Sequence, residues 1–417
     1  MNFLKTSFLS SISTVIRIFS GLISTKFIAI YVGPSGLALI AQLQNFINII
    51  FLFSGGFLTT ALTKYTSQYS DDEIKSHRIW SAAIQLMLAI NFILFLLFFF
   101  FSEFFSLLLF SNKNYSYIVE ILSVSQIFSG INVFFLSIAN GKKKVKKYIV
   151  VNILSSFVSL FLVVGLSYYF SVDGVMVAYT ISQSVVLIIT ILILKNEIWF
   201  GLENFIVKFK CEDVKVLFKF AAITFTSIMS ANISLMLVRK IIESNFSLEE
   251  TGVWQATWNI TQISMTLLTT SFAVYILPVF SSLKRKVDYF LELKKIFLLV
   301  VPVSFLISFL VYILRDFVIL ILYTEEFKGM RDLIAFYMIG SFFKIICWVF
   351  GYIFVAQAKV MICIFVEITM AFIFVVLNYF FIDIFGFIGS SYAYALYSIL
   401  NLFLLLYLFS YKFNPDL

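Results

Sequence analysis

The chain has 417 residues, of which 61% are hydrophobic and only 12% are charged, and 53 are phenylalanine. A soluble domain has about 25% charged residues, so the composition excludes a soluble protein and predicts an all-α integral membrane protein. The single histidine and three scattered cysteines argue against histidine catalysis, a disulfide framework and a metal site, and we expect no cofactor.

Apolar stretches follow one another along the whole chain, and each is long enough to cross a bilayer as a helix of about 20 residues. The first continues well beyond the apolar region of a signal peptide and is expected to be a span. The longest connection, 195–216, is expected to be partly amphipathic and to lie on the membrane surface. We predict twelve transmembrane helices at 6–31, 37–63, 79–101, 115–139, 148–170, 174–194, 217–240, 252–279, 296–314, 331–356, 360–382 and 386–410.

The loops differ in their content of lysine and arginine, which sets the orientation of membrane proteins. With the N-terminus inside, 21 of the 30 basic residues fall on the cytoplasmic side and 6 on the other, and three lie inside spans. This bias predicts that both termini are cytoplasmic. It also accounts for the net charge of +8, which gives no reason to expect nucleic acid as a partner.

Three sequence pairs recur at nearly one offset. Gly36 and Gly252 are 216 positions apart, Ala178 and Ala393 are 215 apart, and "ANGK" at 139–142 resembles "AQAK" 217 positions later. This repeat predicts two six-helix bundles, 1–200 and 201–417, related by a pseudo-two-fold axis along the membrane normal. Transporters of this kind place the substrate at the repeat interface and work by rocking one half against the other.

Basic residues inside or near the ends of spans are the most informative polar positions, since such charges are costly in lipid and usually face a wet cavity. A group of cations suits an anionic substrate such as a diphosphate, which cannot cross hydrocarbon without replacement solvation. The alternatives are snorkelling to the interface for the residues near span ends, and an ion pair of Lys344 with Glu367 for the deepest. The candidate diphosphate ligands are Lys26, Arg17, Arg239, Lys240 and Lys344.

The spacing of Arg17 and Lys26 limits this interpretation. Nine residues separate them, which at about 100° per residue places them on opposite faces of an ideal helix. They can share one cavity only if the helix bends, and Gly21 between them would permit a bend.

Two spans carry amides and tryptophans that could contact sugars. The alternatives are helix–helix hydrogen bonding for the amides and interfacial anchoring for the tryptophans. The candidate sugar-contacting residues are Gln42, Asn45, Asn48, Trp254, Gln255, Trp258 and Asn259.

Several segments, in order along the chain, resemble the Wzx family of polysaccharide-unit flippases, within the superfamily that includes multidrug and toxin exporters. The matching segments are "STKFIAIYVGPSGLALIAQLQNF", "LTKYTSQY", "RKIIESNFSLEETGVWQ", "SFAVYILPVFSSL", "LRDF" and "FKGMRDLIAFYMIGSFFK".

The resemblance implies a flippase in the bacterial inner membrane. Its substrate would be an undecaprenyl-diphosphate-linked oligosaccharide, such as an O-antigen unit of lipopolysaccharide biosynthesis, moved from the cytoplasmic to the periplasmic leaflet by alternating access. It also implies ion-gradient coupling, with a polysaccharide polymerase and a chain-length regulator as candidate partners. Where the family pattern implies a Gly-Asp pair, this chain has Gly340-Ser341, which leaves Glu367 as the candidate for ion coupling.

Two other function classes remain open. A MATE-like exporter of small molecules or drugs would use the same architecture, although a cationic substrate would require acidic residues deep in the spans, where Glu367 is the one candidate. A membrane enzyme such as a polymerase or ligase would require catalytic residues in sizeable outer loops, whereas the outer loops predicted here are short.

Overall fold

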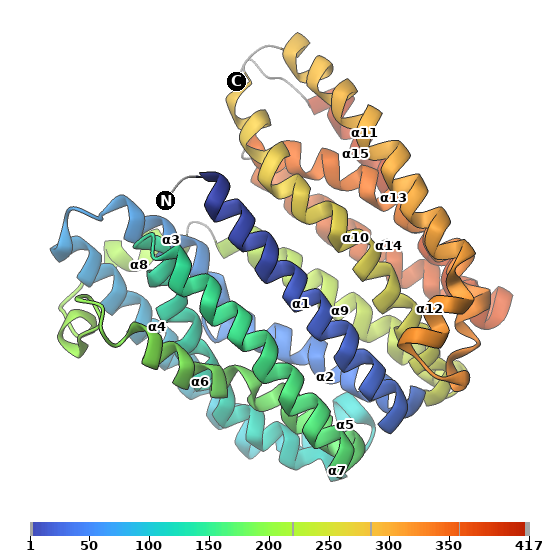
Figure 1. Ribbon diagram of the computed structural model, residues 1–417, viewed down its shortest axis with the longest axis horizontal. Helices are drawn as coiled ribbons and strands as arrows, with labels where there is room; N and C mark the ends of the chain where they lie inside the picture. The colour runs from blue at the N-terminus through green and yellow to red at the C-terminus, as the bar shows by residue number, and fades with distance from the viewer. Residues whose placement is uncertain (1–2, 219–220, 284–285, 358, 413–417) are drawn as a thin grey trace. The chain divides into compact units, whose positions relative to one another are not determined.

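The computed structural model describes residues 3–218, 221–283, 286–357 and 359–412, and its regular elements in these ranges are helices (Figure 1). Contacts divide the chain into two compact units. Unit 1 comprises residues 1–32 and 39–232, and unit 2 comprises residues 33–38 and 233–417. The terminal residues predicted to be cytoplasmic, 1–2 and 413–417, lie outside the described residues, as do Lys284 and Arg285 of a predicted cytoplasmic loop.

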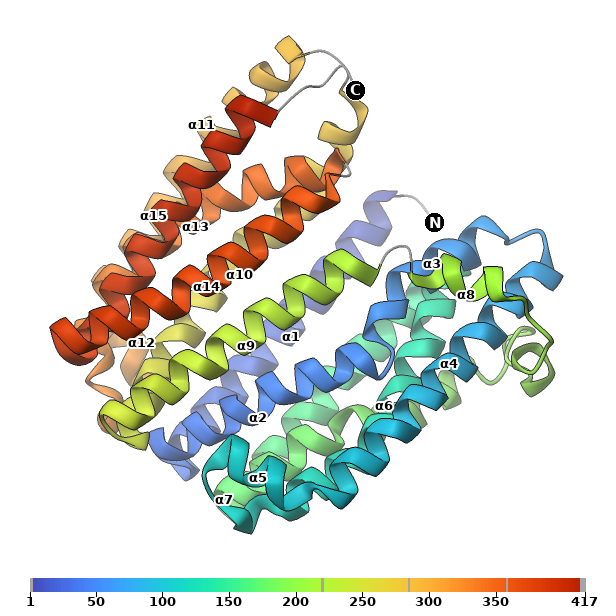
Figure 2. The same ribbon diagram turned by 180° about the vertical axis from the view of Figure 1, so that it is seen from behind.

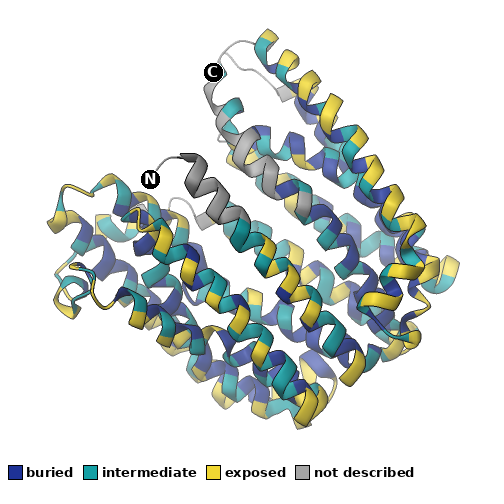
Figure 3. Cartoon of the chain, viewed as in Figure 1, coloured by how far each residue is buried: buried dark blue, intermediate teal, exposed yellow. Residues whose placement is uncertain are grey.

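The helices have the length and the surface of membrane spans. Within the described residues, nine helical runs are long and apolar enough to cross a membrane. Large apolar side chains also point outward along them, for example Phe161 at 71% and Phe372 at 68% exposure. Exposed residues recur along the helices in Figure 3. An outward-facing apolar surface of this extent suits lipid rather than water, so the chain is a multi-pass membrane protein.

Unit 1 is organised around one helix, α6. Helix α6 packs against α3, α4 and α7, and α7 also packs against α1. The core between them is apolar and includes the fully buried Trp80 and Ile138. The helices of unit 1 are α1 (Phe3–Tyr31), most of α2 (Gly33–Phe53), α3 (Thr59–Gln68), α4 (Glu73–Phe100), α5 (Ser102–Phe110), α6 (Ser116–Gly141), α7 (Val145–Leu194), α8 (Cys211–Phe218) and the start of α9 (Ala221–Asn245).

The span predicted at 37–63 is wrong as one continuous helix, because the backbone breaks between α2 and α3. Gly55 has a φ of 148°, which side chains disfavour, and a short 3₁₀ turn follows at Gly56–Leu58. Polar side chains satisfy the groups at the break: the Asn91 amide donates to the Ser54 carbonyl (3.0 Å), and the Ser54 hydroxyl donates to Gln126 Oε1 (2.5 Å). A break inside a membrane requires such partners, because lipid offers none.

The predicted spans 148–170 and 174–194 meet at a second irregular point, inside the 50-residue helix α7. Ser171 leaves the helical region with φ 49° and ψ −126°, and its hydroxyl donates to the carbonyl of Tyr31 at the end of α1 (2.8 Å). The chain therefore changes direction at the position where the sequence predicts an outer turn.

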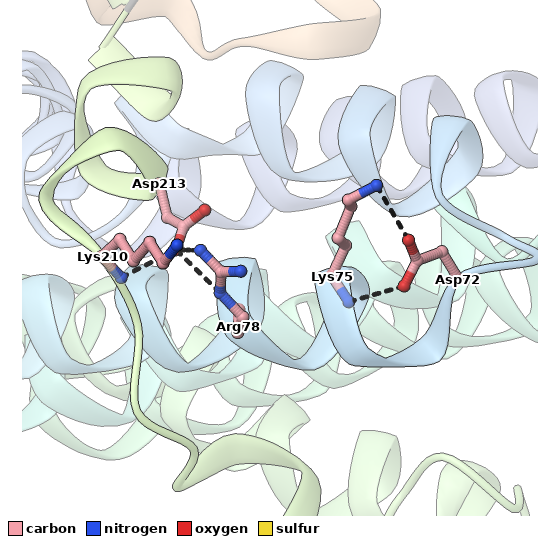
Figure 4. Close-up of polar contacts among 5 residues, drawn as sticks. All are labelled: Asp72, Lys75, Arg78, Lys210 and Asp213. Carbon is pink, nitrogen blue, oxygen red and sulfur yellow. Dashed lines mark hydrogen bonds and ion pairs between the residues drawn. The ribbon is translucent and has the colours of Figure 1, made fainter.

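The connection at 195–216 packs partly into unit 1. Trp199 and Phe205 are buried against Trp80. An ion pair holds the end of this connection, because the Arg78 guanidinium donates to Asp213 Oδ2 at 2.7 Å (Figure 4). The aromatic side chains of this segment thus contribute to the protein core.

Two lysines hold the first turn of the same connection. Glu197 forms ion pairs with Lys144 (2.8 Å) and Lys147 (2.7 Å), both from the basic run at 142–147. Partial burial opposes ionisation of the Glu197 carboxyl, but the hydrogen bonds and charges of the two lysines outweigh it and lower its pKa. Part of the basic run therefore pairs with an acidic side chain of the protein.

Unit 2 is organised around α13, which packs against α10, α11 and α15, while α14 packs against α15 (Figure 2). Its core includes the buried residues Phe280, Ile345 and Phe354. The boundary between the units falls inside α9, between Asn232 and Ile233. The other helices of unit 2 are α10 (Leu248–Ser282), α11 (Lys286–Ile313), α12 (Arg315–Leu322), α13 (Met330–Ala356), α14 (Val360–Phe385) and α15 (Gly389–Lys412).

Candidate functional site

Four of the predicted site residues meet in unit 2, around a buried cation. Arg239 on α9 is only 3% exposed, and its Nη2 donates to Gln255 Oε1 on α10 at 2.6 Å. Gln255 Nε2 donates in turn to Asn259 Oδ1, one helical turn along α10, at 2.8 Å. The guanidinium also lies 5.9 Å from the ring centre of Trp254, within range of a cation–π contact. Amides and an indole thus fix a positive charge within the helices.

Aromatic rings connect this arginine with a second predicted cation. Trp254 stacks on Trp258, whose ring centre is 5.6 Å from that of Tyr394. The ring of Tyr394 also contacts the ring of Tyr397. The Tyr397 hydroxyl accepts a hydrogen bond from Lys344 Nζ at 2.5 Å. The ammonium is also 4.5 Å from the centre of the Tyr397 ring.

We call this group the cation–aromatic cluster. Its charge-assisted donors, aromatic faces and amides are the groups that bind phosphate oxygens and sugar rings. It consists of Arg239, Trp254, Gln255, Trp258, Asn259, Lys344, Tyr394 and Tyr397, all in unit 2.

The alternative ion pair of Lys344 with Glu367 is not formed in the part of the chain that the structure describes. Lys344 donates to Tyr397 instead, and the Glu367 side chain is exposed on α14. Lys240 lies half-buried beside Arg239 and forms a longer ion pair with Glu243, at 3.5 Å. These contacts make Arg239 and Lys344 the most firmly positioned of the predicted cations of unit 2.

The predicted residues of unit 1 lie on α1 and α2. Lys26 is half-buried, whereas Arg17 is exposed on the same unbroken helix, as expected for two residues on opposite faces. On α2, Gln42 and Asn45 are buried, and the amide nitrogen of Asn45 has no hydrogen-bond partner among the described residues. Asn45 is therefore the amide of this helix best suited to an incoming ligand.

Asn48, the third candidate amide on α2, has a helix–helix partner. Its amide nitrogen donates to Asn232 Oδ1 near the middle of α9 (3.2 Å). The alternative of helix–helix hydrogen bonding thus describes the contact that Asn48 makes.

Unit 1 also contains a polar cavity that the sequence does not predict. It has a volume of about 680 Å³ and is lined by residues of α2, α3, α6 and α7, including Asn132, Asn140, Asn152 and Gln183. Polar residues recurring inside apolar spans were the available signal. The signal was weak because these side chains are far apart in the sequence, on α6 and α7, and only the fold brings them together with α2 and α3.

Comparisons with known proteins agree on family and fold. The family described as "Polysaccharide biosynthesis protein" matches residues 3–284. The lipid III flippase of Escherichia coli (strain K12) is 26% identical over 399 residues, covering 94% of this chain and 95% of that protein. The lipid III flippase of Shigella flexneri has the same identity and the same coverage.

Two solved structures share the fold at low sequence identity. An inward-facing multidrug resistance MATE family transporter of the MOP superfamily has a TM-score of 0.77 at 13% identity, covering 95% of this chain and 94% of its own. The lipid II flippase MurJ in an inward closed conformation has a TM-score of 0.72 at 16% identity, covering 98% and 88%. Since the family match extends over more than half of its length, the chain belongs to the polysaccharide biosynthesis protein family, and the family resemblance of its motifs is confirmed.

Proposed function

We propose that this protein is a flippase that moves an undecaprenyl-diphosphate-linked oligosaccharide from the cytoplasmic to the periplasmic leaflet of the bacterial inner membrane. The observation that carries the proposal is the cation–aromatic cluster, in which Arg239 and Lys344 are held inside membrane helices beside tryptophan and tyrosine rings. A buried cation is costly in lipid and is retained where it binds a charged substrate or a partner. The names of the curated relatives, both lipid III flippases, support the same substrate class.

The chemistry of the step follows from the substrate's charge. A diphosphate loses its hydration on entering hydrocarbon, and fixed guanidinium and ammonium groups replace part of that solvation. Moving each negative charge outward across an inside-negative membrane is favourable by about 2.3 kcal/mol per 100 mV. In this proposal Lys26, Arg239 and Lys344 contact the diphosphate, the amides and tryptophans contact the sugars, and the prenyl chain stays in lipid.

The proposal also includes the finer features expected from the sequence. These are twelve spans in two six-helix halves, 1–200 and 201–417, cytoplasmic termini, and alternating access coupled to an ion gradient through Glu367. A polymerase and a chain-length regulator would use the product.

Deletion of the gene in its own bacterium tests the proposal. We expect the lipid-linked oligosaccharide to accumulate in the cytoplasmic leaflet and surface polysaccharide to be lost, because a diphosphate head group does not cross the bilayer unaided. Thin-layer analysis of extracted lipids and leaflet-selective labelling measure both effects, and the wild-type gene on a plasmid should reverse them. Unchanged polysaccharide together with new sensitivity to cationic drugs would contradict the proposal and favour an exporter.

A further inference from the structure

The polar cavity of unit 1 lies at the break between α2 and α3. Its lining includes Phe51 before the break and Thr59 and Thr60 after it. The Thr59 hydroxyl donates to the carbonyl of Gly56 in the intervening turn (2.9 Å). In secondary transporters, interrupted membrane helices commonly line the substrate site, because backbone freed from the helix is tolerated only where it faces protein or a cavity.

Four amide side chains on α6 and α7 line the cavity, beside the hydroxyls of threonine, serine and tyrosine residues. Asn132 is positioned by its neighbours, since its Oδ1 accepts from Thr190 (2.6 Å) and its Nδ2 donates to Gln183 (3.4 Å). Asn140 and Asn152 also line the cavity, and within the described ranges their side chains hydrogen-bond to no other residue. Each therefore offers two donors and an acceptor to a ligand.

The charge of the lining selects the kind of ligand. Among the described residues that line the cavity there is no carboxylate, and Lys64 is its one cation. A metal ion or cationic drug would have no charge partner here, and a purely apolar ligand would leave the amides unsatisfied. An uncharged polyol, or one with a single acidic group beside Lys64, needs no carboxylate and can hydrogen-bond to the amides. The ring of Tyr148 adds an aromatic face to the cavity.

From these observations we infer that this cavity of unit 1 binds sugar residues of the lipid-linked oligosaccharide. The inference rests on the proposed function, and it adds a sugar site that the sequence does not reveal. A volume of about 680 Å³ lies within the range of sites for drug-sized ligands, which suits a short oligosaccharide. Lys64, Asn140 and Tyr148 flank connections predicted to be cytoplasmic, so the cavity would receive the head group from the side of its synthesis.

Asn152→Leu tests this inference, because it replaces the amide with an apolar side chain that has the same number and branching of heavy atoms, and it breaks no side-chain hydrogen bond to a described residue. The matched control is Gln85→Leu, which removes an exposed amide on α4 that does not line the cavity. Purified proteins in nanodiscs are titrated with two probes. One is the glycolipid extracted from the deletion strain, and the other is undecaprenyl diphosphate without sugar. We expect Asn152→Leu to bind the glycolipid about tenfold more weakly and the sugar-free lipid as the wild type does, with Gln85→Leu unchanged for both.

The remaining outcomes separate this inference from the proposed function. Wild-type affinity of Asn152→Leu for the glycolipid would overturn the sugar site and leave the flippase proposal standing. Equal weakening for both probes would also overturn it, since the residue would then act on the lipid diphosphate or on the fold. A wild-type protein that binds neither probe would refute the proposed function itself, and the sugar site with it.

Discussion

Replacing Arg239 with methionine is expected to abolish export of the lipid-linked oligosaccharide while leaving the protein in the membrane at wild-type level. Methionine is also long and unbranched but carries no charge, so the substitution removes the cation with little change in packing. Replacing a buried ionic group with an apolar side chain of similar size costs little in itself, since desolvation of the ion opposes its contacts. The buried Gln255 Oε1 loses its donor, which costs about 1–3 kcal/mol. The measurements are surface polysaccharide, cytoplasmic glycolipid and membrane protein level.

Arg331→Met is the matched control for this substitution. Arg331 lies at the start of α13, is 57% exposed in its side chain and pairs with the equally exposed Asp316, at 3.2 Å. Exposed pairs of this kind contribute about 0–1 kcal/mol, so export and stability should stay at wild-type values. Full export by Arg239→Met would show that the buried cation has no role in transport, and a collapse in protein level would indicate a structural role instead.

A second large effect is expected from Gly252→Ala, which should destabilise unit 2. A Cβ atom at Gly252 on α10 would lie 1.8 Å from the backbone oxygen of Pro34, in the first turn of α2. Backbone atoms cannot move aside as a flexible side chain can, so the two helices must separate. Overpacking costs typically 1–3 kcal/mol, and we expect about 3 kcal/mol here. The measurement is the temperature at which the detergent-solubilised protein loses its monomeric peak in size exclusion.

Gly351→Ala in α13 is the corresponding control, because no atom outside its immediate helix lies within 4 Å of the added methyl group. Alanine favours a helix over glycine by about 1 kcal/mol, so this variant should be as stable as the wild type or slightly more stable. Equal thermal stability of Gly252→Ala and the wild type would mean that α10 does not pack on the start of α2.

The helical architecture follows from composition, whereas the breaks within helices depend on tertiary contacts. The apolar run at 37–63 gave no reason to divide it, although Gly55 and Gly56 are adjacent there. The break is stabilised by Asn91 and Gln126 on two other helices. Partners so distant in sequence cannot be identified from local pattern.

The repeat in the sequence has a local counterpart in the structure. Gly174 and Gly389 are 215 positions apart, the offset found between Ala178 and Ala393. A Cβ at either glycine would lie about 2 Å from a backbone oxygen, that of Leu166 in one case and Phe381 in the other. The sequence match therefore reflects the same close turn between consecutive helices.

The candidate site was predictable where its residues share a helix. Gln255 and Asn259 are one turn apart, and their hydrogen bond follows from helical spacing. The alternative interpretation, an ion pair of Lys344 with Glu367, was wrong. Charge alone suggested Glu367, whereas the fold places the hydroxyl of Tyr397 beside Lys344. The unit 1 cavity was missed because residues of four helices form it.

Reconstitution tests the central claim most directly. Purified protein is placed in sealed vesicles with the glycolipid extracted from the deletion strain, and the fraction of glycolipid accessible to an external glycosidase is measured. A flippase that uses a buried cation should make the inner-leaflet glycolipid accessible with the wild-type protein and with Arg331→Met, but not with Arg239→Met. Accessibility that stays at the value of protein-free vesicles with every variant would contradict the account.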